Sequence, residues 1–350
     1  MKAMLVTLTA AMLLPAGLNA ADVDLGGDIR LRHETIDQDG KDTRHRWRVR
    51  ARVTASADVT EAVSAHLRLA SGSDDPTSSN QTFGDGSSTK DFNLDRAYLK
   101  YEPQDSSLAI IGGKHGVPFN TAGDLIWDGD LNLEGLTATY GMHAFAVNLG
   151  AYWAEERSST SDTLLFGAQV TADSDMGLSG SIGYYLWDNM KGFAPLFDVA
   201  NARGNTVVEA EDGSLTYAED FGVLNANIEF DTAVGDMPLT VFGEYVTNTD
   251  ADGDKDAGFM LGIKVGKATD PGMWQASLDY RDLEADATVG LFADSDSFGG
   301  GTDGQGFRVK AKYILAKNLS AGAAVYLQQI DPDGADLDHQ RLQLDLVAKF

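Results

Sequence analysis

Arginine occupies every second position of the segment RHRWRVRARV, which spans residues 44–53. Successive side chains of a β-strand point to opposite faces, so the five guanidinium groups would share one face. They belong to Arg44, Arg46, Arg48, Arg50 and Arg52. The intervening positions are mostly apolar, so the strand would be wet on one side only. Such a ladder attracts anions and carboxylates. The alternative is a solvated strand face on a soluble protein.

A second group of charged residues lies in GVPFNTAGDLIWDGDL, residues 116–131, where Asp124, Asp128 and Asp130 flank the apolar triplet 125–127. A surface loop gains little from Leu-Ile-Trp, whereas a loop folded inward would pack the triplet against a wall. If the strands enclose a barrel, these carboxylates are predicted to face the guanidinium groups and form a constriction. Opposed charges in a low-dielectric channel create a transverse field that orients water and polar solutes. The alternative is a surface loop with a buried tryptophan.

Signals for catalysis or for a cofactor are weak. The six histidines are scattered, and none lies in an HExxH or serine-elbow motif, so we predict that the protein is not an enzyme. The segment NTDADGDKDAG begins like a calcium loop at Asn248, but its twelfth position is Phe259 instead of glutamate. No cofactor and no metal site are predicted. Weak Ca²⁺ or Mg²⁺ binding by the acidic loops is the alternative to solvated aspartates.

The chain has 350 residues with 27 basic and 53 acidic side chains, for a formal net charge of −26. This acidity argues against a nucleic-acid partner, which needs a basic face to displace counterions. The opening MKAMLVTLTAAMLLPAGLNA combines Lys2, an apolar run at 3–14 and Ala20. The pattern predicts a signal peptide at 1–20, because the apolar run is shorter than the ~20 residues of the alternative, a membrane anchor.

The rest of the chain alternates between apolar and polar residues with a period of two. In HQRLQLDLVAKF, leucines alternate with polar residues up to Phe350 on the apolar face. About sixteen such segments are joined alternately by short turns and long Asp/Gly/Ser-rich loops, the layout of an outer-membrane barrel. Backbone groups in hydrocarbon need protein partners, so strands cross a membrane only as a closed sheet, and a ring this wide encloses water. We predict an all-β fold at 21–350: a closed antiparallel transmembrane β-barrel with short periplasmic turns and long extracellular loops.

Strand parity and barrel closure extend the arginine ladder into a basic arc of the inner wall. The first and last strands become neighbours when the sheet closes, so basic residues near both ends of the chain would face the lumen. The predicted pore-lining residues are Arg30, Arg32, Arg44, Arg46, Arg48, Arg50, Arg52, Arg68, Arg96, Arg308, Lys310 and Lys312. Because salt screens the acidic outer loops over about 8–10 Å, the ladder favours anion preference or little preference.

Two segments, LASGSDDPTSSNQTFGDGSSTKDFNLDRAYLKYEP and GGKHGVPFNTAGDLIWDGDLNLEGL, resemble the Gram-negative "putative porin" family. That family is similar in architecture to the sixteen-stranded general diffusion porins. The resemblance is densest at 43–141 and implies an outer-membrane channel for small hydrophilic solutes, set among lipid and lipopolysaccharide and often trimeric. It also implies that the loop with the three aspartates is a constriction loop. An outer-membrane barrel enzyme and an exported, soluble β-rich adhesive or carbohydrate-binding protein are the alternatives.

Overall fold

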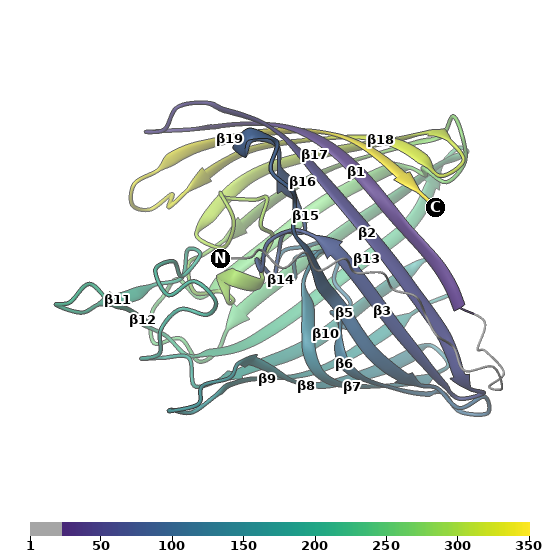
Figure 1. Cartoon of the computed structure of the whole chain (residues 1–350), viewed down its shortest axis with the longest axis horizontal. Helices are drawn as coiled ribbons and strands as arrows, with labels where there is room; N and C mark the ends of the chain where they lie inside the picture. The colour runs from purple at the N-terminus through teal and green to yellow at the C-terminus, as the bar shows by residue number, and fades with distance from the viewer. Residues whose placement is uncertain (1–22) are drawn as a thin grey trace, which may run out of the picture.

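The computed structural model describes residues 23–350, in which sixteen long antiparallel strands form a closed ring (Figure 1). The wall strands are β1 (Val23–Gln38), β2 (Arg44–Thr60), β3 (Val63–Ser71), β5 (Phe92–Tyr101), β6 (Leu108–Gly116), β7 (Asn132–Met142), β8 (Phe145–Glu155), β9 (Thr163–Asp173), β10 (Leu178–Asp188), β13 (Phe221–Val234), β14 (Met237–Asn248), β15 (Ala257–Gly266), β16 (Trp274–Leu283), β17 (Gly304–Ala316), β18 (Leu319–Ile330) and β19 (Leu337–Lys349). Smaller elements lie in the connections: β4 (Gln81–Thr82), β11 (Val207–Glu209), β12 (Leu215–Tyr217) and the 3₁₀ turns η1 (Asp85–Ser87) and η2 (Gly290–Phe292). The predicted signal peptide at 1–20 lies outside the described residues.

Pairing between the first and last strands closes the ring. β1 pairs with β2 on one edge and with β19 on the other, so Arg32 lies opposite both Arg48 and Asp345. A closed sheet leaves no edge with unpaired backbone groups. The predicted closed antiparallel barrel of sixteen strands is therefore confirmed. Within residues 23–350, no helix is long and apolar enough to cross a membrane.

The connections at the two ends of the ring differ in length. At one end, short turns such as 143–144 and 317–318 join neighbouring strands. The opposite end carries the long loops, and the hairpin of β11 and β12 at the left of Figure 1 marks it. The longest loops are 72–91, 117–131, 189–220 and 284–303. Residues of these loops build the interior of the molecule.

The alternation of residue types gives the wall two different faces. Along β19, Leu342, Leu344 and Leu346 are exposed on the outside, whereas Arg341 and Gln343 are buried on the inside. A soluble β-sandwich would bury the leucines instead. In a bilayer, the outer leucines contact lipid while the backbone hydrogen bonds are made between strands. The wall is thus built for a lipid exterior and a polar interior.

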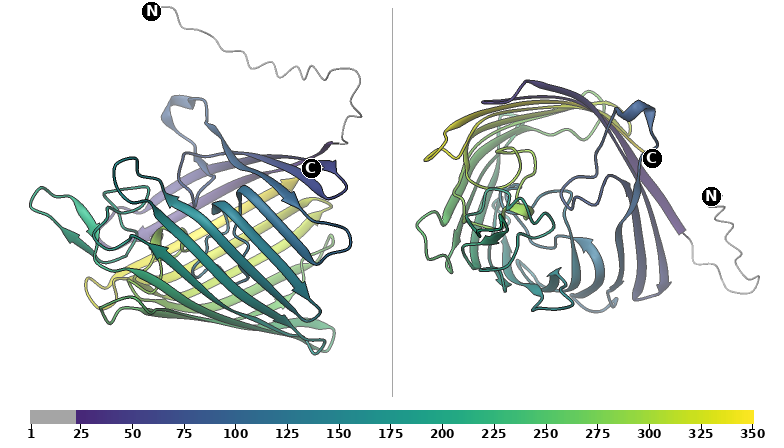
Figure 2. Two further views of the ribbon diagram at one scale, coloured as in Figure 1. Left: turned by 90° about the horizontal axis from the view of Figure 1, so that it is seen from below. Right: turned by 60° about the vertical axis from the view of Figure 1, so that its left-hand side comes forward.

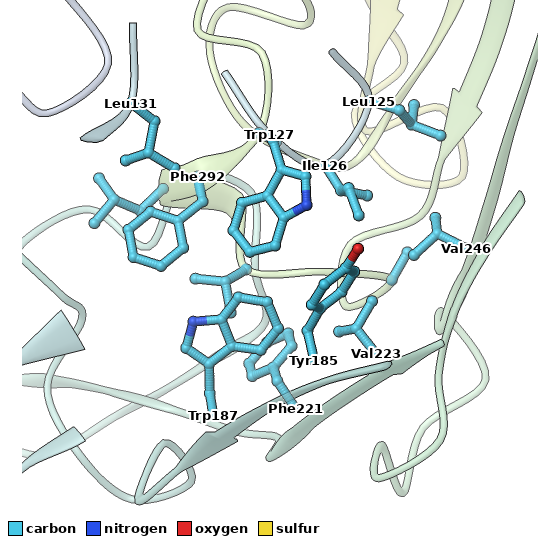
Figure 3. Close-up of a cluster of buried hydrophobic side chains, with 14 of the residues drawn as sticks. Leu125, Ile126, Trp127, Leu131, Tyr185, Trp187, Phe221, Val223, Val246 and Phe292 are labelled. Carbon is cyan, nitrogen blue, oxygen red and sulfur yellow. The ribbon is translucent and has the colours of Figure 1, made fainter. Parts of the chain in front are cut away.

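The hydrophobic core lies inside the ring. Loop 117–131 and η2 contribute apolar side chains that pack on inward residues of β10, β13 and β14 (Figure 3). This core fills the lumen on the side of β8–β10 and β13–β14. The core leaves a cavity on the side lined by β1, β2 and β16–β19. Figure 2 shows the loops gathered within the ring of strands. The open part of the lumen therefore runs along the basic arc.

Candidate functional site

Loop 117–131 is held inside the ring by the apolar triplet that stands out in its sequence. Residues 125–127 are each at most 4% exposed. The indole of Trp127 lies 5.1 Å from the ring of Tyr185 and 5.7 Å from that of Trp187, measured between centroids (Figure 3). Burying a large apolar side chain contributes roughly 1.5–3 kcal/mol. The triplet therefore fixes the loop across the lumen.

A second loop, 284–303, enters the lumen and joins the first, and it was not predicted from the sequence. The backbone N–H of Asp128 donates to the carbonyl of Phe292 at 2.7 Å, and the backbone N–H of Ser295 donates to Asp128 Oδ2 at 2.8 Å. The ring of Phe292 also stacks on the indole of the first loop at 6.2 Å. The run ATVGLF at 287–292 is apolar within a polar loop, which is the same signal as Leu-Ile-Trp. That run could have revealed the second loop.

Asp124 lies against β16 and β17, where three basic side chains converge on it. Its carboxylate accepts hydrogen bonds from Arg308 Nη1 at 2.6 Å, Arg281 Nη2 at 3.1 Å and Lys310 Nζ at 3.2 Å. Burial raises the pKa of the Asp124 carboxyl, but the three cations outweigh burial and hold this pKa well below its ordinary value. Asp124 is therefore ionised, and its charge is already balanced by the wall.

Asp130 contacts the arginine ladder directly. Its Oδ1 lies 3.4 Å from Arg50 Nη1 and 3.5 Å from Arg52 Nη1. Burial opposes ionisation, yet Arg50, Arg30 and Arg52 together lower the pKa of Asp130. The inward loop thus touches the wall at Asp124 and again at Asp130. The carboxylates and guanidinium groups expected to face one another across the channel form direct ion pairs at these two points.

Asp128 has a different environment from the other two aspartates. Its oxygens accept the backbone N–H groups of Asp130 at 2.7 Å and Ser295 at 2.8 Å. Burial, and then the nearby Asp294, raise the pKa of Asp128 to about 8. This carboxyl joins the two inward loops and, when protonated at neutral pH, adds no negative charge to the lumen.

Arginines face one another across the pair of β1 and β2. Arg30 lies opposite Arg50, and Arg32 lies opposite Arg48. Like charges directly opposite one another destabilise a sheet. Carboxylates of the wall, which were not predicted from the sequence, separate these guanidinium groups. The contacts are Asp28 with Arg50 (3.0 Å) and Arg52 (2.8 Å), Asp345 with Arg32 (2.7 Å), and Glu34 with Arg46 and Arg341.

Five of the predicted pore-lining arginines do not line the main cavity: Arg44, Arg46 and Arg48, which lie nearer the long loops on β2, and Arg68 and Arg96. Arg68 pairs with Asp95, and Arg96 Nε donates to Asn132 Oδ1 at 2.6 Å. Asn132 is the first residue of β7. These contacts fix the point where loop 117–131 returns to the wall. Their role in conduction stays a prediction.

The open part of the lumen is a cavity of about 650 Å³ between the inward loops and the basic arc. Its charged lining consists of the basic residues Arg30, Arg32, Arg50, Arg52, Lys264, Arg308, Lys310 and Lys312 and the acidic residues Asp124, Asp128, Asp130, Asp279, Asp294, Asp296 and Asp345. All of the acidic side chains except Asp128 contact a basic one. In contrast, Arg30, Lys264 and Lys312 have no carboxylate oxygen within 4.0 Å in the part of the chain that the structure describes. The charges left free in this cavity are cations.

The acidic outer loops make protein contacts. Asp252, in the segment that begins like a calcium loop, accepts a 2.6 Å hydrogen bond from Lys191 Nζ. Across residues 23–350, no group of three or more His, Asp or Glu side chains has an arrangement that could hold a metal ion. Weak binding of Ca²⁺ or Mg²⁺ stays a prediction.

A sequence model of the "Putative porin" family matches the chain over residues 30–214 and 214–350. Comparison with curated protein sequences gives no match. Among solved structures, Pseudomonas putida OprB at high pH is similar with a TM-score of 0.64 and 12% identity, covering 94% of each chain. The in-vitro folded trimer form of Vibrio cholerae OmpT gives a TM-score of 0.55 and 15% identity, covering 95% of this chain and 100% of that one. A mutant of Rh. blastica porin gives 0.53 and 13%, covering 94% and 100%. At these identities, the structural similarity concerns the fold.

Proposed function

The chain belongs to the "Putative porin" family and is a β-barrel of the outer membrane, and on this premise we propose that it forms a water-filled channel for passive diffusion. Small hydrophilic solutes and ions pass between the inward loops and the basic arc. The observation that carries the proposal is the cavity of about 650 Å³, whose lining carries eight basic and seven acidic side chains. A polar lumen inside an apolar wall lets water and ions cross without entering lipid.

The same cavity supports a preference for anions. Its carboxylates are held by arginines and lysines, as Asp124 is by Arg308 at 2.6 Å. The cations of Arg30 and Lys312 face the cavity without such a partner among residues 23–350. In a narrow pore the nearest charges dominate, because more distant loop charges are screened over about 8–10 Å. The chain's overall acidity therefore has little weight at the constriction.

We propose that the barrel lies in the outer membrane as a trimer. The belt of exposed leucines and aromatics on the outside of the strands fits lipid, with lipopolysaccharide around the long extracellular loops and the short turns toward the periplasm. The similar Vibrio cholerae OmpT structure is of a trimer form, and we extend that state to this chain. A soluble adhesive protein would not expose Leu136 and Leu344, which are 58% and 47% exposed.

An enzyme is the weaker hypothesis. The carboxylates that line the cavity are committed to ion pairs or to backbone N–H groups, as Asp128 is to Ser295. No nucleophile with an adjacent base stands out among the residues that line the cavity. The proposed activity has no catalytic step and needs no cofactor.

Planar bilayers test the channel directly. Purified, refolded residues 21–350 should insert and give discrete current steps in potassium chloride. Heat-modifiable migration on a gel would show separately that the barrel has folded. A folded barrel that gives no current steps would contradict the proposed function.

A further inference from the structure

A second cavity, of about 360 Å³, lies nearer the long loops and extends the arginine wall outward. It is separate from the constriction but shares Ser295 and Asp296 with it. Its basic lining comprises Lys41, Arg44, Arg46, Arg48, Arg203 and Arg341. Only three acidic residues, Asp42, Asp75 and Asp296, line it. We call this space the outer cavity.

Two of the acidic residues are already bound to arginines. Asp296 Oδ1 lies 2.7 Å from Arg341 Nη2, and Asp75 Oδ2 lies 3.7 Å from Arg203 Nη2. Arg44, exposed near the rim, has no carboxylate oxygen within 4.0 Å in the described chain. Glu34, behind the lining, also pairs with Arg46 and Arg341. Six basic residues thus meet four carboxylates, and the outer cavity keeps an excess of positive charge.

Three residues that line the outer cavity have buried nitrogen atoms without a protein partner. His339 is 2% exposed, and neither of its ring nitrogens has a hydrogen-bond partner between residues 23 and 350. The buried Nε atoms of Arg48 and Arg203 also lack partners within that range. A buried donor that stays unsatisfied has lost its water without gaining a protein acceptor, which is unfavourable. Three separate elements, β2, loop 189–220 and β19, thus bring unsatisfied nitrogens to one cavity.

We propose that the outer cavity binds a small oxyanion, namely phosphate or the phosphate group of a small metabolite. An oxyanion offers several acceptor oxygens, which suit the planar donor fork of arginine and a ring N–H of histidine at the same time. A hard cation such as Ca²⁺ or Mg²⁺ needs oxygen ligands, and any metal cation would meet the repulsion of the surrounding guanidinium groups. Hydrogen bonds to charged groups are also the stronger ones.

The outer cavity is placed to deliver anions to the constriction, and in this respect the inference rests on the proposed channel. Arg44, Arg46 and Arg48 line the outer cavity, and Arg50 and Arg52 line the inner one. Along a strand that rises about 3.3 Å per residue, successive rungs stand about 7 Å apart. An anion leaving the outer cavity thus meets a guanidinium group at each step toward the constriction.

Calorimetry with inorganic phosphate tests the binding site without relying on conduction. The refolded protein in detergent is titrated with sodium phosphate at constant ionic strength, and saturable binding is expected. Arg203→Gln should weaken the affinity about tenfold, the loss expected for one charge-assisted hydrogen bond. The matched control is Lys191→Gln on the same loop, because Lys191 Nζ lies 2.6 Å from Asp252 and outside the outer cavity. His339→Leu, a second variant, should also weaken binding while leaving the net charge unchanged at neutral pH.

The outcomes separate this inference from the proposed function. Absence of saturable phosphate binding would overturn the inference, even if the protein forms channels in bilayers. Equal weakening by Arg203→Gln and Lys191→Gln would also overturn it, because it would show attraction by overall charge. Binding of lipopolysaccharide phosphate but not of free phosphate would overturn the assignment to a diffusing solute. Phosphate binding without current steps would support the site and contradict only the channel.

Discussion

At the scale of single residues, the inward arginines are stabilised by carboxylates that lie far away in the sequence. Arg32 contacts Asp296, 264 residues away, at 3.1 Å, and Glu34 contacts Arg341 across the closure of the ring. Removing one partner of a buried ion pair leaves the other charge uncompensated. The resulting loss of stability is larger than the net stabilisation that the intact pair provides. The charged wall therefore depends on a few buried carboxylates.

Glu34 is the clearest case, because it is fully buried and contacts Arg46, Arg341 and Gln343. We expect Glu34→Gln to lower the free energy of unfolding by about 3–5 kcal/mol. The control is Glu134→Gln, whose side chain is 62% exposed beside Lys114 and which should cost at most about 1 kcal/mol. Urea unfolding in lipid vesicles measures both. Equal losses in the two variants would contradict the importance of the buried pair.

Asp128 predicts a dependence on pH at the joint between the two inward loops. Its pKa is raised to about 8 in the folded protein from an ordinary value of 3.8. Between these two values, the folded protein holds a proton that the unfolded chain releases. The contribution of Asp128 to the free energy of unfolding is therefore fully present below the ordinary pKa and is lost as the pH rises through about 8. Single-channel current noise from loop motion should therefore increase as the pH passes that value. Asp128→Asn should abolish the increase, and an identical increase in this variant would refute the assignment.

At the scale of elements, loop 117–131 acts as the partition of the lumen. Its triplet at 125–127 is buried against β10, and its two ionised aspartates reach opposite parts of the basic arc. The apolar anchor fixes the position of the loop, while the ion pairs with the wall fix its orientation. The width of the channel therefore depends on apolar packing as much as on charge.

Trp127→Ala should release loop 117–131 from the inner wall without disrupting the pairing of the barrel strands. Removing a buried tryptophan typically costs about 3–5 kcal/mol, and the loss would fall on the loop, because the strands are paired independently of it. We expect a larger and noisier single-channel conductance. The matched control is Trp153→Ala, since Trp153 is 55% exposed on the outer face. A conductance equal to that of the wild type in both variants would show that the loop does not limit the channel.

The strands and the inward path of loop 117–131 are readable from sequence because each depends on a local pattern. A wall between lipid and water imposes a period of two, and Leu-Ile-Trp in an acidic loop demands a buried partner. The ion pairs are not readable in the same way, since Arg32 meets Asp345 and Asp296 only after the ring closes. Local patterns therefore reveal the arginines of the wall. They do not reveal which of these arginines are paired with carboxylates and which basic residues stay unpaired.

At the scale of the whole molecule, the barrel separates two charge distributions. The chain carries a net charge of −26, much of it in outer loops. The constriction instead has carboxylates that are paired or protonated and a few cations that are free. In the proposed channel, this local balance would set the ion selectivity, because salt screens the outer charges over about 8–10 Å. The central claim is thus that an acidic protein forms an anion-preferring pore.

The most direct test is the reversal potential of the refolded protein in a planar bilayer under a potassium chloride gradient. The wild type should prefer chloride, and the double variant Arg30→Gln/Lys312→Gln should shift toward potassium with its current steps intact. The control Lys317→Gln, in the short turn at 317–318, should leave the reversal potential unchanged. A cation-selective wild type, or a double variant with unaltered selectivity, would contradict the claim that free cations at the constriction govern the channel.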